Sequence, residues 1–194
     1  MILLLCSCLS HYDVQNFSTL KLRNYTDFSK YDRIRFNGYY CATDTCMRSL
    51  KSKFGYSAIV LYKDGSMINL YFKSENDIGK PIHDLRDIYT IHPGIVYSIE
   101  GDTIKCEAYY NNGLFKLDTE NLNYLILNKD SLMSVYPGRP ELSLIYKFVK
   151  SPLLPDAINV KLKGNEWIWE DKQEYEIYKR KKKEYDDSLK TFEE

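Results

Sequence analysis

The sequence predicts an all-β domain, an antiparallel up-and-down β-barrel, followed by a C-terminal helix. Two features support this fold class. Between residues 33 and 149, apolar and polar residues alternate in short runs, as they do in strands with one buried face. Short turns join the runs, which places consecutive strands side by side and antiparallel. Eight such strands can close into a barrel without unpaired edges, and a two-sheet β-sandwich is the alternative.

Each expected strand follows from its own pattern and its flanking turn. In the first, Ile34, Phe36, Gly38 and Tyr40 alternate with more polar residues. An Asp-Gly turn at residues 64–65 is the strongest short hairpin signal in the chain. The expected strands span residues 33–40, 56–63, 66–73, 95–100, 103–110, 114–117, 122–127, 131–136 and 141–149.

The connection from residue 74 to residue 94 breaks the strand period. Ile82, Leu85 and Ile88 are spaced as on one face of a helix, so we expect a short helix there. Connections of this length in compact domains are often functional, and this one is expected to cover one mouth of the barrel.

The last segment, residues 171–194, is expected to be a charged helix. Its apolar positions recur at steps of three and four, from Tyr175 and Tyr178 through Tyr185 to Leu189. The basic run 179–183 is flanked by acidic residues that can pair with it along the helix. We therefore expect a self-neutralised helix and no nucleic-acid partner. The aromatic stripe needs a surface, either the outside of the barrel or a protein partner.

Composition excludes several classes of protein. The 194 residues carry 27 Lys plus Arg and 27 Asp plus Glu, so the formal net charge is zero. Such a balance lacks the basic surplus that binds phosphate backbones. With 44% apolar residues and only 9 glycines and 6 prolines, the chain is neither collagen-like nor a disordered tail.

The N-terminus predicts a lipid anchor. Leu5-Cys6-Ser7-Cys8 resembles the lipobox of bacterial lipoproteins, with Cys8 as the acylated residue. Residues 1–8 would be a partial signal, and residues 9–31 a tether to a barrel domain spanning 32–170. Because the apolar run is shorter than a signal peptide's, we expect the natural start to lie upstream. The expected location is the bacterial outer membrane, facing the periplasm or the cell surface, with the lipid as the membrane contact.

The remaining cysteines suit an oxidising compartment. Cys41 and Cys46 are separated by four residues, and they form either a disulfide or two unpaired thiols. Cys106 alternates with apolar residues in an expected strand, which predicts a buried, inert thiol.

A family resemblance agrees with the predicted barrel. Gly38-Tyr39-Tyr40 resembles the Gly-x-Trp motif of lipocalins, with Tyr in place of Trp. The hairpin ladder that follows, with turns at residues 64–65 and 101–102, is similar to lipocalin-like lipoproteins of Bacteroides-type bacteria. The resemblance covers about residues 30–170. It implies an eight-stranded barrel with a small cavity, and it implies no reaction.

The barrel interior is the expected ligand site. An eight-stranded barrel is filled by its side chains or holds one small ligand, here expected to be apolar. The residues expected to face inward are Phe36, Tyr40, Ala58, Val60, Ile104, Ala108, Leu144, Tyr146 and Phe148. The alternatives are a filled barrel that acts as an interaction or assembly subunit, and an enzyme whose residues converge only in the fold. No catalytic motif appears, and no catalytic residue, metal or cofactor is expected.

Overall fold

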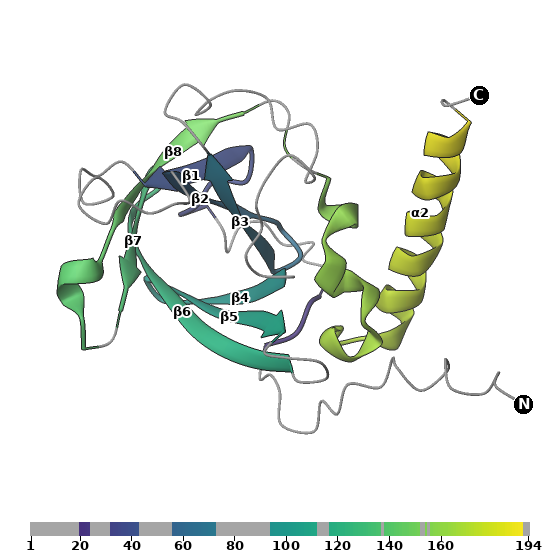
Figure 1. Cartoon of the computed structure of the whole chain (residues 1–194), viewed down its shortest axis with the longest axis horizontal. Helices are drawn as coiled ribbons and strands as arrows, with labels where there is room; N and C mark the ends of the chain where they lie inside the picture. The colour runs from purple at the N-terminus through teal and green to yellow at the C-terminus, as the bar shows by residue number, and fades with distance from the viewer. Residues whose placement is uncertain are drawn as a thin grey trace, which may run out of the picture.

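The structure, a computed structural model, describes residues 20–23, 32–42, 56–72, 94–111, 117–136, 138–151, 154 and 156–191. Eight antiparallel strands form a closed barrel in which each strand pairs with its neighbours in chain order (Figure 1). The last strand returns to pair with the first, which confirms the predicted up-and-down barrel and excludes the sandwich.

The strands are β1 Gly38–Ala42, β2 Tyr56–Leu61, β3 Ser66–Phe72, β4 Gly94–Glu100, β5 Thr103–Asn111, β6 Leu117–Asn128, β7 Ser131–Val135 and β8 Ile145–Lys150. The 3-10 helices are η4 Pro140–Leu142, η5 Ala157–Asn159, η6 Lys161–Gly164 and η7 Glu166–Ile168. The C-terminal helix is α2, Lys172–Lys190, which confirms the helix expected there. Its N-cap is Asp171, whose side chain accepts a hydrogen bond of 2.7 Å from the Gln173 amide.

Several strand boundaries differ from the expectation. The first strand begins at Gly38 and not at Arg33, because residues 33–37 turn across one end of the barrel. The strand expected at 141–149 begins at Ile145, because residues 140–142 form the 3-10 helix η4. Leu117 and the run expected at 122–127 belong to one long strand, β6, while residues 114–116 lie outside the described residues. Alternation of apolar and polar residues indicates that one side of a segment is buried. Strands show this pattern, and so do the turns that flank them, so alternation alone does not fix where a strand begins.

The barrel interior is lined by one cluster of buried side chains from all eight strands, named here the interior cluster. Strand alternation places every second residue inside, as with Ile59 and Leu61 of β2. Its members are Ile34, Tyr40, Ala42, Ile59, Leu61, Met67, Ile95, Tyr97, Ile104, Cys106, Ala108, Tyr124, Ile126, Leu132, Leu144 and Tyr146, with Phe36, Ile99, Leu122 and Phe148 packed against them.

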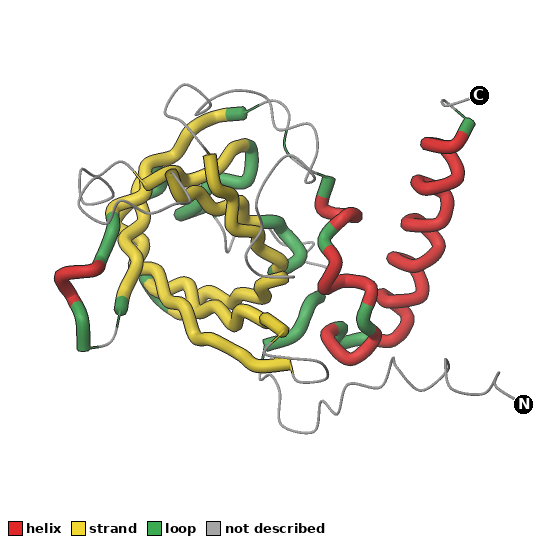
Figure 2. Tube along the Cα trace, viewed as in Figure 1, coloured by secondary structure: helices red, strands yellow, loops and turns green. Residues whose placement is uncertain are grey.

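A second cluster, the outer cluster, lies on the outside of β1 to β5. The 3-10 helices that follow the barrel cover this face, and α2 lies beyond them (Figures 1 and 2). Its buried members are Leu22, Tyr39, Cys41, Ala58, Val60, Tyr62, Ile68, Leu70, Val96, Tyr109, Val160, Leu162 and Ile168. Half of the barrel is therefore buried on both faces.

Part of the expected tether contributes to this cover. Leu22 is fully buried, and its amide donates a 2.7 Å hydrogen bond to the Ile168 carbonyl. The Glu170 amide donates back to the Leu22 carbonyl at 2.9 Å. Residues 20–23 are thus a packed segment of the domain and not a free linker.

Candidate functional site

One end of the barrel is closed by residues 32–37, which are tied to the hairpin turns. Arg33 forms an ion pair with Asp102 and donates to the Gly101 carbonyl at 3.3 Å, both in the β4–β5 turn. Arg35 Nε lies 2.5 Å from Asp130 Oδ1, in the β6–β7 turn. The segment is therefore fastened at two points of the barrel rim.

Apolar and aromatic packing completes this closed end. Ile34 is buried in the interior cluster, and Phe36 packs against it. The Tyr40 hydroxyl accepts a hydrogen bond from the Arg35 amide at 2.7 Å and donates to the Lys129 carbonyl at 3.0 Å. Burial raises the pKa of Tyr40 to about 12, so this hydroxyl stays protonated and keeps its donor at neutral pH.

The opposite end of the interior, named here the loop end, has a different composition. The closed half presents large side chains such as Tyr40, Leu61 and Tyr97. Toward the loop end several inward positions are small or polar, next to the apolar Ile95 and Leu144: Ala42, Ser57, Asn69, Ala108, Ser134 and Tyr146. Small and hydroxylated side chains leave hydrogen-bonding groups inside the barrel, where apolar chains would otherwise fill the space.

Asn69 is the most informative of these residues. It alternates with Met67 of the interior cluster, whereas Ile68 and Leu70 belong to the outer cluster. Asn69 is 8% exposed, and among the described residues no hydrogen-bond donor reaches its Oδ1. Leaving a buried acceptor unpaired costs about 1–3 kcal/mol.

Asn69 lies in the loop-end half of β3. Among the described residues, β3 pairs with β4 only at Ser66–Val96 and Met67–Ile95. Asn69 lies two residues beyond the last of these pairs, on the loop-end side. A ligand with an N–H or O–H group could supply the missing hydrogen bond.

Two hydroxyls lie in the same half of the interior. Ser57 Oγ lies 3.4 Å from the Tyr146 hydroxyl, and either atom can donate. The Tyr146 ring packs edge-on against Tyr124, with 5.7 Å between ring centroids. This half of the interior therefore contains the Asn69 oxygen, the hydroxyls of Ser57 and Tyr146, and the rings of Tyr124 and Tyr146.

Most residues expected to face inward do so, and they divide between the two halves. Phe36, Tyr40 and Phe148 lie toward the closed end, Ala108, Leu144 and Tyr146 lie toward the loop end, and Ile104 belongs to the same interior cluster. Their role in holding a ligand stays a prediction.

Val60 and Ala58 were expected inside, and this was wrong. Both belong to the outer cluster, because Ile59 and Leu61 take the inward positions of β2. The run is apolar on both faces, since the 3-10 helices cover its outside, and so alternation cannot choose between the faces. Asn69, which sequence reasoning missed, was detectable as a polar residue in register with Met67.

Two cysteines, Cys41 and Cys106, lie among the described residues. Cys41 is buried, and burial raises the pKa of its thiol to about 11. Its expected partner Cys46 lies outside the described residues, as do Cys8 and the three histidines, so the disulfide stays a prediction. Cys106 is buried, as expected, with its Sγ 4.0 Å from Met67 Sδ.

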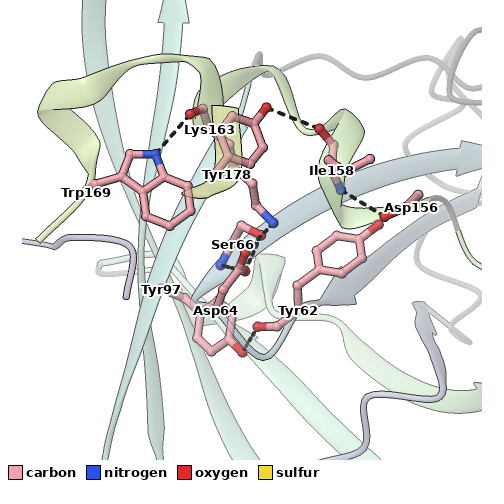
Figure 3. Close-up of polar contacts among 9 residues, drawn as sticks. All are labelled: Tyr62, Asp64, Ser66, Tyr97, Asp156, Ile158, Lys163, Trp169 and Tyr178. Atoms are coloured by element: carbon pink, nitrogen blue, oxygen red, sulfur yellow. Dashed lines mark hydrogen bonds and ion pairs between the residues drawn. The ribbon is translucent and has the colours of Figure 1, made fainter. Parts of the chain in front are cut away.

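A buried ion pair joins the barrel to its cover (Figure 3). Lys163 of η6 pairs with Asp64 of the β2–β3 turn, and the side chains are 3% and 21% exposed. Asp64 Oδ1 also accepts from the Ser66 amide at 3.0 Å and the Ser66 hydroxyl at 2.6 Å. The Lys163 ammonium lies 5.5 Å from the Tyr62 ring centroid. Every charge here has a partner inside the protein, which favours a structural role.

Comparison of the chain with protein-family models, curated proteins and solved structures gives no match. Within the described residues, no group of three or more His, Cys, Asp or Glu side chains is placed to hold a metal ion. None of the helices described is both long and apolar enough to cross a membrane.

Proposed function

We propose that the protein is a non-enzymatic binding protein of the bacterial cell envelope that holds a small, largely apolar ligand at the loop end of the barrel. The observation that carries the proposal is the buried Asn69 Oδ1, which no hydrogen-bond donor of the described residues reaches. A ligand with an apolar body and one N–H or O–H group matches this environment. The aromatic packing at the closed end restricts the site to the other half of the interior.

Two matched probes test the hydrogen bond to Asn69. Indole has an apolar body and one N–H, and 1-methylindole has the same body without the donor. Wild-type protein is expected to bind indole about five- to tenfold more tightly, which corresponds to about 1 kcal/mol for one net hydrogen bond. Ligand-observed NMR titration measures both dissociation constants.

The Asn69→Leu variant is expected to lose this preference, because it removes the acceptor. The control is Asn121→Leu, the same substitution at an exposed position of β6. Equal affinity of the wild-type protein for the two probes, or equal loss in both variants, would contradict the proposed contact.

The membrane anchor is a separate part of the proposal. It is supported by the spacing of Leu5, Ser7 and Cys8. We expect radiolabelled palmitate fed to the native host to enter the wild-type chain and not Cys8→Ala, because the Cys8 thiol is the acylated atom. Label in both chains, or in neither, would exclude this anchor.

A second candidate function is docking of a protein partner on α2. The expected aromatic stripe divides, since Tyr175 and Tyr178 contact the 3-10 segment while Leu189 is exposed. Ile177 is also exposed on α2, and two apolar side chains twelve residues apart are ordinary for a protein surface. The loop end of the barrel therefore remains the better supported site.

A further inference from the structure

A cavity of about 400 Å³ lies between α2 and the 3-10 helices η5 and η6, outside the barrel. Its walls are Lys161, Lys179 and Lys182, the side chains of Tyr175 and Tyr178, and Val160 and Gly164. The volume falls in the range of small-molecule sites. Three cations and two aromatic residues thus meet in one hollow.

Hydrogen bonds to the main chain hold the aromatic wall in place. The Tyr175 hydroxyl donates to the Gly164 carbonyl at 3.2 Å, and the Tyr178 hydroxyl donates to the Ile158 carbonyl at 3.2 Å. The Tyr178 ring also packs on Trp169, with 5.4 Å between centroids (Figure 3). The Lys179 ammonium lies 5.9 Å from the Tyr175 ring centroid, so this ring already faces a cation. With both hydroxyls engaged, a ligand in the cavity would meet the tyrosines through their rings.

The lining carries positive charge without an acidic residue. Lys182 pairs with Asp186 and Lys179 lies 3.9 Å from Glu176, but neither acid lines the cavity and both are substantially exposed. Exposed pairs along a helix are weak, so an anion with several simultaneous contacts can compete with them.

We propose that this cavity is a second ligand site, separate from the barrel interior, for a small organic anion that carries a phosphate or carboxylate group on an aromatic body. The lysine ammonium groups bind the anionic group, and the tyrosine rings stack on the aromatic part. The expected ligand is a free small molecule that fits the cavity volume.

Gly164 gives a way to block the site. A Cβ added at this residue meets no atom within 4 Å, so a larger side chain extends into open space. The hydrogen bond from Tyr175 uses the Gly164 carbonyl and survives the substitution. Gly164→Leu should therefore fill the cavity while leaving its walls in place.

Three probes test the anionic group and the aromatic ring of the expected ligand separately. Phenyl phosphate carries both the anion and the ring, inorganic phosphate only the anion, and benzyl alcohol only the ring. NMR titration of the full chain is expected to give a dissociation constant for phenyl phosphate of about 1 mM or tighter, and at least about tenfold weaker binding of the other two. Failure of phenyl phosphate to bind, or equal binding of inorganic phosphate, overturns the proposal.

Variants then locate the binding. Lys179→Gln and Lys182→Gln are expected to weaken phenyl phosphate binding about three- to tenfold each, and Gly164→Leu to abolish it. Lys181→Gln and Lys183→Gln remove the same charge from the same basic run but do not line the cavity, so they should change binding less than twofold.

Equal weakening by all four lysine variants would mean diffuse attraction and would overturn the site, as would full binding by folded Gly164→Leu. Circular dichroism verifies the fold of each variant, and the exposed lysine variants decide the outcome if Gly164→Leu does not fold. Asn69→Leu is expected to leave phenyl phosphate binding unchanged, which separates this site from the barrel interior.

Discussion

Gly38 lies where the first and last strands close the barrel, opposite Lys150 of β8. A Cβ at this position would lie 2.1 Å from the Val149 carbonyl oxygen and 2.6 Å from Cζ of Phe148. The Phe148 ring itself packs on Tyr40 at 5.3 Å between centroids. The Gly-x-Tyr motif is thus a packing requirement: the glycine leaves room for a ring that the tyrosine then contacts.

This predicts a large effect for a small substitution. Gly38→Ala should lower the free energy of unfolding by about 1–3 kcal/mol, because overpacking forces the β1–β8 seam to shift. Gly164→Ala is the matched control, since its Cβ enters open space and should be neutral or slightly stabilising. Chemical denaturation measures both, and equal stability of the two variants would contradict the close approach at Gly38.

Side-chain direction was clearest where a strand has one buried face. Ile104 lies between the polar Thr103 and Lys105, and its inward position followed from the pattern. Val60 has apolar neighbours on both sides in the sequence. Its side chain points outward, where 3-10 helices from the later part of the chain cover it. Asn69 could be placed in register, but only the fold shows that no donor among the described residues reaches its oxygen.

At the scale of elements, the segment between β8 and α2 acts as a cover that sequence patterns did not identify. Its 3-10 helices are three or four residues long, too short for a helical period to appear. Close contact supports the packing: a Cβ on Gly94 of β4 would lie 2.2 Å from Leu162 Cβ. The Asp64–Lys163 ion pair and a hydrogen bond from Trp169 Nε1 to the Lys163 carbonyl, 2.9 Å long, add to it.

Substitution of Asp64 should destabilise the protein more than substitution of Lys163. Asp64→Asn leaves a buried ammonium unpaired and should cost about 3–5 kcal/mol of unfolding free energy. Lys163→Met leaves a carboxylate that is 21% exposed and still bonded to Ser66, so it should cost less, about 1–2 kcal/mol.

Chemical denaturation of both single variants and of the double variant checks this asymmetry. The double variant should be more stable than Asp64→Asn alone, because no charge remains buried. Lys161→Met, an exposed neighbour in η6, is the control. An equal or smaller cost for Asp64→Asn than for Lys163→Met would contradict the buried state of the lysine.

At the scale of the whole molecule, turns and alternation predicted a closed barrel, because eight short antiparallel neighbours have few other ways to cover their edges. The difference between the two ends of the barrel was not predictable from the sequence. It arises from residues far apart in the chain: Arg33 and Arg35 fasten one end to distant turns, while Asn69 and Ser57 face the other. One end is thereby built for closure, and the other is the end proposed for binding.

Native mass spectrometry of protein purified from its own host tests this central claim most directly. The wild-type protein is expected to carry the added mass of one small molecule that is released on denaturation, and the denatured spectrum accounts for any covalent lipid. Asn69→Leu should lack most of this mass, and Asn121→Leu should retain it. A wild-type protein without bound mass, or the same bound mass in all three proteins, would contradict a ligand site at the loop end of the barrel.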